Sequence, residues 1–163
     1  MHPHLSRVVP DDPRPTHSDL SSWEATIREA VGAERDGRIT PALAGYRRAL
    51  EIAQRLIETP PPSRHDDCVA ALVVSWHNLA DLLASQGDVE RCVEGLCDAH
   101  EALIALYLDA RRDALLRRAA LRHGRETHLA LVRHMARHGE HPRIVRALRE
   151  GSLALDVGSA VRH

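Results

Sequence analysis

Residues 67–107 constrain the fold most, because apolar residues recur there at steps of three and four on both sides of Gly87. That spacing places apolar side chains on one face of an α-helix, and glycine suits the left-handed position just after a helix end. The segment therefore predicts a helical hairpin whose two helices are joined at residues 86–88. Its apolar positions are Val69, Leu72, Val73, Trp76, Leu79, Ala80 and Leu83, then Val89, Cys92, Val93, Leu96, Ala99, Leu103 and Leu106.

Two further helices are expected before this hairpin. The first begins near Ser21 or Ser22 and ends at Asp36, before a glycine. The second ends at residues 59–63, because three consecutive prolines cannot continue a helix. Its expected buried side chains are Ala42, Leu43, Tyr46, Ala49, Leu50, Ala53 and Ile57.

Two more helices are expected after the hairpin. One covers about residues 114–137 and ends at Gly139, and the last begins at Pro142, with Gly151 as a weak point inside it. The apolar side of the first of these is expected to carry Leu116, Ala120, Leu121, His128, Leu131, Val132 and Met135.

Local sequence signals also predict how three of these helices begin. Thr40 is expected to cap the second helix, with Pro41 in its first turn, where the missing N–H costs nothing. Asp67 is expected to cap the third helix and Asp113 the fifth, because a carboxylate accepts hydrogen bonds from the free amides of a first turn.

A chain of 163 residues suits one domain with a substantial core. Residues 1–17 contain four prolines and no apolar periodicity, which predicts a flexible arm. Residues 18–157 are expected to form a single helical domain, and residues 158–163 to fray.

The charge composition argues against two classes of partner. The formal net charge is −1 and the sequence pI about 6.9, so the chain has no overall field that would attract nucleic acid or an anionic membrane. We therefore expect neither nucleic-acid nor membrane binding.

The cysteines and the apolar runs bear on location. Cys68, Cys92 and Cys97 leave one cysteine unpaired in any intramolecular pairing, and none forms a C-x-x-C motif, which favours the reducing cytoplasm. No signal-peptide run is apparent, and no segment approaches the roughly 18 uninterrupted apolar residues of a membrane span. A soluble cytoplasmic protein is expected.

An internal repeat is the strongest inference from the sequence. When Gly37, Gly87 and Gly139 are aligned, at separations of 50 and 52 residues, the expected helices on either side align as well. The best-preserved unit has the pattern Trp76, Leu79, Ala80, Leu83, Gly87, Asp88, Cys92, Leu96 and Ala99.

This pattern resembles the tetratricopeptide repeat (TPR) family over about residues 22–155. The first unit matches through Ala42, Tyr46 and Ala49, whereas the third has His128 where the large apolar residue belongs. The period is longer than the family's usual repeat of about 34 residues. The resemblance implies an all-α, right-handed stack of about three antiparallel helix pairs, whose first helices line a concave face that binds peptides or partner proteins.

Polar residues beside the apolar stripes suggest a binding groove. Residues spaced four apart on a helix project together, and arginines hold carboxylates through paired hydrogen bonds. The alternative is an ordinary solvated helix face. The expected groove residues are His77, Asp81 and Ser85 from the third helix, and Glu126, Arg133 and Arg137 from the fifth.

A second candidate is a metal site, since the chain contains 12 histidines. Several side chains, such as His134 and His138, have the spacing at which two ligands on one helix reach one ion. Zinc or another late transition metal would suit the mixture, although hydrogen-bonded core histidines are the commoner arrangement. The candidate ligands are His77, Asp81, Cys97, His100, His123 and His128.

No catalytic motif is apparent: the chain lacks a Gly-x-Ser-x-Gly elbow, a phosphate-binding glycine loop and a His-Glu-x-x-His stretch. Cys97, His100 and Glu101 have no sequence feature that would orient them as a catalytic group. We therefore expect a non-enzymatic interaction or adaptor module without a cofactor that binds a protein or peptide segment. A metal-responsive protein is the alternative, and a homo-oligomer is compatible with either.

Overall fold

The computed structural model describes residues 18–160, which form six α-helices and no strand. The expected all-α chain of six helices is thus confirmed. The predicted arm at residues 1–17 lies outside the described residues, as do residues 161–163, and the last helix includes the first three residues of the end expected to fray. The helices are α1 (Ser18–Arg35), α2 (Ile39–Glu58), α3 (His65–Ser85), α4 (Val89–Leu108), α5 (Ala114–His138) and α6 (Pro142–Ala160).

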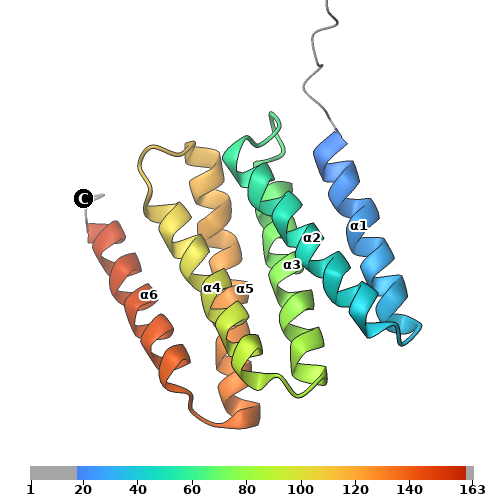
Figure 1. Cartoon of the computed structure of the whole chain (residues 1–163). Helices are drawn as coiled ribbons and strands as arrows, with labels where there is room; N and C mark the ends of the chain where they lie inside the picture. The colour runs from blue at the N-terminus through green and yellow to red at the C-terminus, as the bar shows by residue number, and fades with distance from the viewer. Residues whose placement is uncertain (1–17, 161–163) are drawn as a thin grey trace, which may run out of the picture.

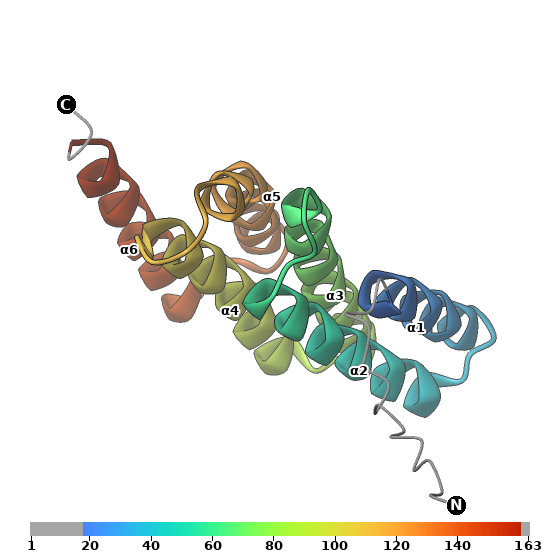
Figure 2. The same ribbon diagram turned by 90° about the horizontal axis from the view of Figure 1, so that it is seen from above.

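The helices lie in two layers (Figure 1). Seen from above, α1, α3 and α5 follow one side of the molecule, and α2, α4 and α6 follow the other (Figure 2). Each helix from α1 to α4 packs against the next in sequence, and α3 also packs against α5. Helix α6 packs mainly on α4 and touches α5 only slightly.

Two turns are built alike and a third differs. Gly37 and Gly87 both have positive φ angles, +72° and +79°, and each is flanked by the paired backbone hydrogen bonds of a Schellman motif. Gly139 also has a positive φ, +87°, but donates a single backbone bond to the Met135 carbonyl. Helix α5 therefore ends in a different turn motif from α1 and α3.

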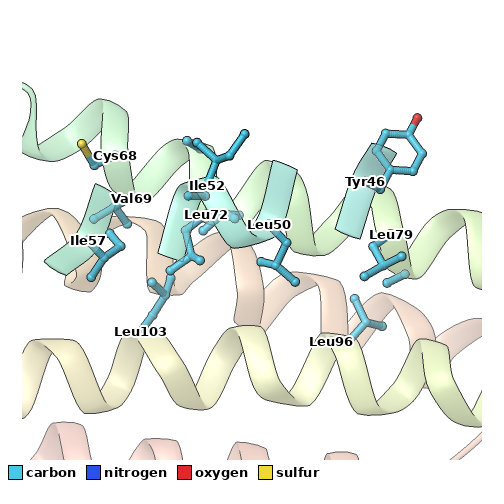
Figure 3. Close-up of a cluster of buried hydrophobic side chains, with 14 of the residues drawn as sticks. Tyr46, Leu50, Ile52, Ile57, Cys68, Val69, Leu72, Leu79, Leu96 and Leu103 are labelled. Carbon is cyan, nitrogen blue, oxygen red and sulfur yellow. The ribbon is translucent and has the colours of Figure 1, made fainter. Parts of the chain in front are cut away.

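A continuous core runs between the two layers (Figure 3). Tyr46 is almost fully buried, and its hydroxyl donates a hydrogen bond to Glu34 on α1. Trp23 on α1 donates to the Ser75 hydroxyl on α3 at 2.8 Å, which satisfies two polar groups at the boundary of the core. Leu43 is only half-buried, whereas Ile52 and Leu56, which were not among the expected core residues, are buried.

The first two helix pairs cross at equivalent small residues. A Cβ added to Gly45 on α2 would lie 2.7 Å from the Ala30 Cβ on α1. Fifty residues later in each helix, a Cβ on Gly95 would lie 3.8 Å from the Ala80 Cβ. At Gly45 the α1 and α2 backbones approach too closely for a side chain, whereas an added Cβ at Gly95 would make ordinary van der Waals contacts.

The third pair lacks this small pair. With Gly87 and Gly139 aligned, the equivalent positions are occupied by Val132 and Ala147. Val132 is 39% exposed and Ala147 is buried. At these positions the third pair thus has bulkier residues than the first two, and α5 and α6 touch only slightly.

The structure corrects two of the three expected caps. Helix α2 begins at Ile39 and the residue before it makes no side-chain cap, so Thr40 already lies inside the helix. Asp67 also lies in a first turn, because α3 begins at His65. The third prediction is confirmed: the Asp113 carboxylate accepts from the Leu115 amide at 2.7 Å.

The apolar face of α5 is confirmed only in part: Leu116, Ala120 and Leu131 are buried as expected. His128 is exposed instead of partly buried, and Val132 is also exposed. Thr127 and His134 take buried positions instead. The apolar periodicity misplaced part of the face because this helix buries two polar side chains, each with a contact to a polar or sulfur atom from α4.

Within residues 18–160, α3 is long and apolar enough to cross a membrane by length and composition. The core helix of a soluble protein passes the same test, and α3 buries ten of its residues against its neighbours.

Replacing Gly45 with alanine tests the close crossing. The new methyl group would meet both the Cβ and, at 3.2 Å, the Cα of Ala30, so the two backbones must separate. We expect a loss of about 1–3 kcal/mol in the free energy of unfolding, measured by urea denaturation.

Gly32→Ala is the matched control, because a Cβ there meets nothing within 4 Å. Alanine in a helix interior should stabilise that variant by about 0.5–1 kcal/mol. Equal stability changes in the two variants would mean that α1 and α2 do not approach closely at Gly45.

Candidate functional site

Four of the six expected groove residues meet in one cavity. His77 and Asp81 enter it from α3, Arg133 and Arg137 from α5, and Leu96 of α4 forms part of its floor. The cavity, called here the α3–α5 cavity, has a volume of about 300 Å³. The spacing of four residues on each helix brings each pair to the same side of its helix.

The other two expected residues lie outside the cavity lining. The Ser85 hydroxyl donates to the Leu82 carbonyl at 2.7 Å, within the last turn of α3. Glu126 is exposed, and its carboxylate lies 3.0 Å from the Nδ1 atom of His123. Ser85 and Glu126 therefore do not join the other four groove residues.

His77, which lines this cavity, has an unsatisfied ring nitrogen. Its Nε2 atom is buried and has no hydrogen-bond partner among residues 18–160. Burial lowers the pKa of His77, and the nearby Asp81 and Glu126 carboxylates only partly oppose this effect. A buried polar atom without a partner is costly, and a ligand that hydrogen-bonds to it would remove that cost.

The charges around the cavity are unbalanced. Arg133 and Arg137 are exposed, and neither forms an ion pair with a carboxylate in the described part of the chain. Asp81 is the single carboxylate among the described residues of the lining. Two guanidinium groups against one carboxylate favour an anionic ligand.

Two histidines of the lining were not among the expected groove residues. The His134 and His138 rings lie with their centroids 4.6 Å apart, and the His134 Nδ1 atom lies 4.0 Å from the Cys92 sulfur. Their spacing of four residues was a usable signal, but it suggested a pair of metal ligands.

The candidate metal ligands have separate partners. His100 on α4 is buried, and its Nδ1 atom lies 2.9 Å from the Thr127 hydroxyl on α5. His123 lies with its Nε2 atom 2.9 Å from a carboxylate oxygen of Asp66 on α3. These pairs tie neighbouring helices together.

In the part of the chain that the structure describes, no three His, Cys, Asp or Glu side chains are grouped so that they could hold a metal ion. Burial also raises the pKa of the Cys97 thiol to about 11, so a thiolate ligand or nucleophile is disfavoured at neutral pH. The structure thus offers the metal alternative no preformed site. Cys68, Cys92 and Cys97 are all buried and free, as expected of small core residues.

A second cavity was not anticipated from the sequence. It lies between α4, α5 and α6 where the third pair is open, and has a volume of about 590 Å³. Its lining is mostly apolar and includes His100 and His128, whose ring centroids are 6.0 Å apart. It is called here the α5–α6 cavity. The expectation of three equivalent helix pairs left no space for it.

The buried histidines predict a pH-dependent stability. Burial lowers the pKa of His77, His100 and His134, so the folded chain resists protons that the unfolded chain binds. Stability should therefore be full above the unfolded histidine pKa of about 6.5 and fall as the pH drops below it. We expect a lower melting temperature at about pH 5.5 than at about pH 7.5.

His134→Gln should reduce this pH dependence, whereas His128→Gln, at an exposed ring, should keep most of it. The same steep decline in all three proteins would assign the pH dependence to groups other than His134.

The comparison with known proteins identifies a family. Residues 21–162 match the family described as "Protein of unknown function (DUF2753)". No curated protein and no solved structure matches the chain. The match spans nearly all of the six helices and every residue of both cavities. The chain therefore belongs to the DUF2753 family.

Proposed function

We propose that this protein is a non-enzymatic interaction module that binds an acidic segment of a partner protein in the α3–α5 cavity. The observation that carries the proposal is that His77, Asp81, Arg133 and Arg137, from two helices, line one cavity with a surplus of positive charge. The buried, unpartnered Nε2 atom of His77 supports a ligand that reaches below the surface.

We further propose a TPR-like architecture of antiparallel helix pairs stacked with a right-handed twist. The equivalent crossings at Ala30–Gly45 and Ala80–Gly95, and the matching turns at Gly37 and Gly87, support a repeated unit. In such a stack, α1, α3 and α5 are the first helices of their pairs. The α3–α5 cavity then lies on the face that the resemblance assigns to partner binding.

The absence of an enzymatic role is part of the proposal. Of the three residues considered for catalysis, His100 bonds to Thr127, and Glu101 bonds to Arg143 on α6 with an Oε2–Nη2 distance of 2.9 Å. Burial raises the pKa of the third, Cys97. These partners support structural roles. A cytoplasmic location, with no nucleic acid or membrane as partner, completes the proposal.

Charge reversal tests the binding site. The variant Arg133→Glu/Arg137→Glu should lose binding to fluorescein-labelled peptides of mixed Asp and Glu, measured by fluorescence anisotropy at low salt. The reason is that two favourable charges become two repulsive ones at the cavity rim. Wild-type affinity should fall as salt is added, because both arginines are exposed and screened.

Arg47→Glu/Arg48→Glu on α2 is the matched control, since these arginines are exposed and lie outside the cavity. It changes the net charge equally and should keep binding nearly unchanged. If both double variants lost binding equally, the binding would depend on overall charge and not on this cavity. If the wild-type protein bound Asn- and Gln-substituted peptides equally well, the ligand would not need to be acidic.

A further inference from the structure

We propose that the α5–α6 cavity is a second binding site, which takes a small amphipathic anion with one apolar chain. This site is separate from the α3–α5 cavity and does not depend on the function proposed there. Its volume of about 590 Å³ lies within the range of about 300–1,000 Å³ typical of small-molecule sites.

The cavity exists because α6 leaves α5. Helix α6 packs mainly on α4 and touches α5 only slightly, and Ile144 and Ala147 on α6 are buried. The space between the two helices stays open over α4. Its walls carry Leu103, Ile104, Leu121 and Leu155, which suit an apolar chain.

Two glycines line this space. Gly151 on α6 is buried, and a Cβ there would lie 2.6 Å from the His100 Nε2 atom, so any side chain would collide with the imidazole. Gly124 on α5 has nothing within 4 Å of an added Cβ, so no neighbour requires glycine there. Glycine inside a helix lowers stability by about 1 kcal/mol relative to alanine. In the described structure, Gly124 offsets this cost with no closer packing and leaves the cavity open.

The hydrogen bonds of His100 define the inner end of the site. The Thr127 hydroxyl donates to the Gly124 carbonyl at 3.0 Å, so its oxygen accepts from the His100 Nδ1–H. In neutral His100 the Nε2 atom then carries no proton. Burial lowers the pKa of His100, which favours this neutral form. The inner wall therefore offers no ring N–H to an anion, and the apolar chain belongs there.

The charged head of the ligand belongs at the rim. Arg125 lines the cavity, is exposed, and pairs with no carboxylate among residues 18–160. His128 stands beside it on α5 and is also exposed. Among the described residues that line the cavity, none is acidic. An apolar interior with a single guanidinium at its mouth is complementary to an apolar molecule with one carboxylate or a similar anionic group.

Dodecanoate below its micellar concentration is the probe, titrated into the tag-free full chain by isothermal titration calorimetry. We expect saturable binding of one molecule per chain. Butanoate should bind at least about tenfold more weakly, because it buries too little apolar surface. Dodecyltrimethylammonium should also bind at least about tenfold more weakly, because its charge opposes that of Arg125.

Gly124→Leu should fill the cavity and weaken dodecanoate binding by about tenfold or more, while preserving the fold, because leucine favours helix and an added Cβ has nothing within 4 Å. Gly32→Leu is its control, made at a helix glycine of α1 that also has nothing within 4 Å. Arg125→Gln should weaken binding several-fold, and Arg118→Gln, at an exposed α5 arginine outside this cavity, should not.

Equal binding by Gly124→Leu and Gly32→Leu would overturn the site, and equal binding of the anionic and cationic amphiphiles would overturn its charge preference. A second copy of the chain is the competing occupant. If sedimentation shows that the wild type self-associates and Gly124→Leu does not, the cavity is a self-interface and the ligand proposal fails.

Discussion

The close contact between paired helices governs the rest of this structure. Where an alanine faces a glycine, as at Ala30–Gly45 and Ala80–Gly95, two backbones approach and their flanking side chains interdigitate into one core. In the third pair, Val132 and Ala147 take the equivalent positions, and α6 packs on α4 and only slightly on α5. This pair is therefore open, and the α5–α6 cavity lies in it.

The number and order of helices could be predicted because apolar periodicity and helix-ending glycines are local signals. The burial of Thr127 and His134 on α5 could not be predicted in this way. Thr127 and His134 are polar, so periodicity assigns them to the surface, yet each is buried against a residue of α4: His100 for the first and Cys92 for the second. Such pairing joins residues 27 and 42 positions apart, and no local pattern reports it.

The two cavities differ in how far the sequence predicts them. The α3–α5 cavity could be anticipated in part, because His77 and Asp81, and likewise Arg133 and Arg137, follow helical spacing beside apolar stripes. Its His134 and His138 could not be placed before the face of α5 was known. The α5–α6 cavity forms because α6 does not pack on α5 as a repeated unit would. An alignment of three equivalent helix pairs therefore does not predict it.

The attachment of α6 explains how an open pair remains ordered. Arg143 bonds to Glu101 and lies 3.3 Å from Asp98, both on α4, so charged groups reinforce the apolar contact between these helices. Arg143 is partly shielded from solvent, which makes this bonding stronger than that of a fully exposed pair. Because α6 is held by α4 and only slightly by α5, the distance between α5 and α6 is set by the α4–α6 contact. A bound apolar chain between them would therefore add contacts without displacing existing ones.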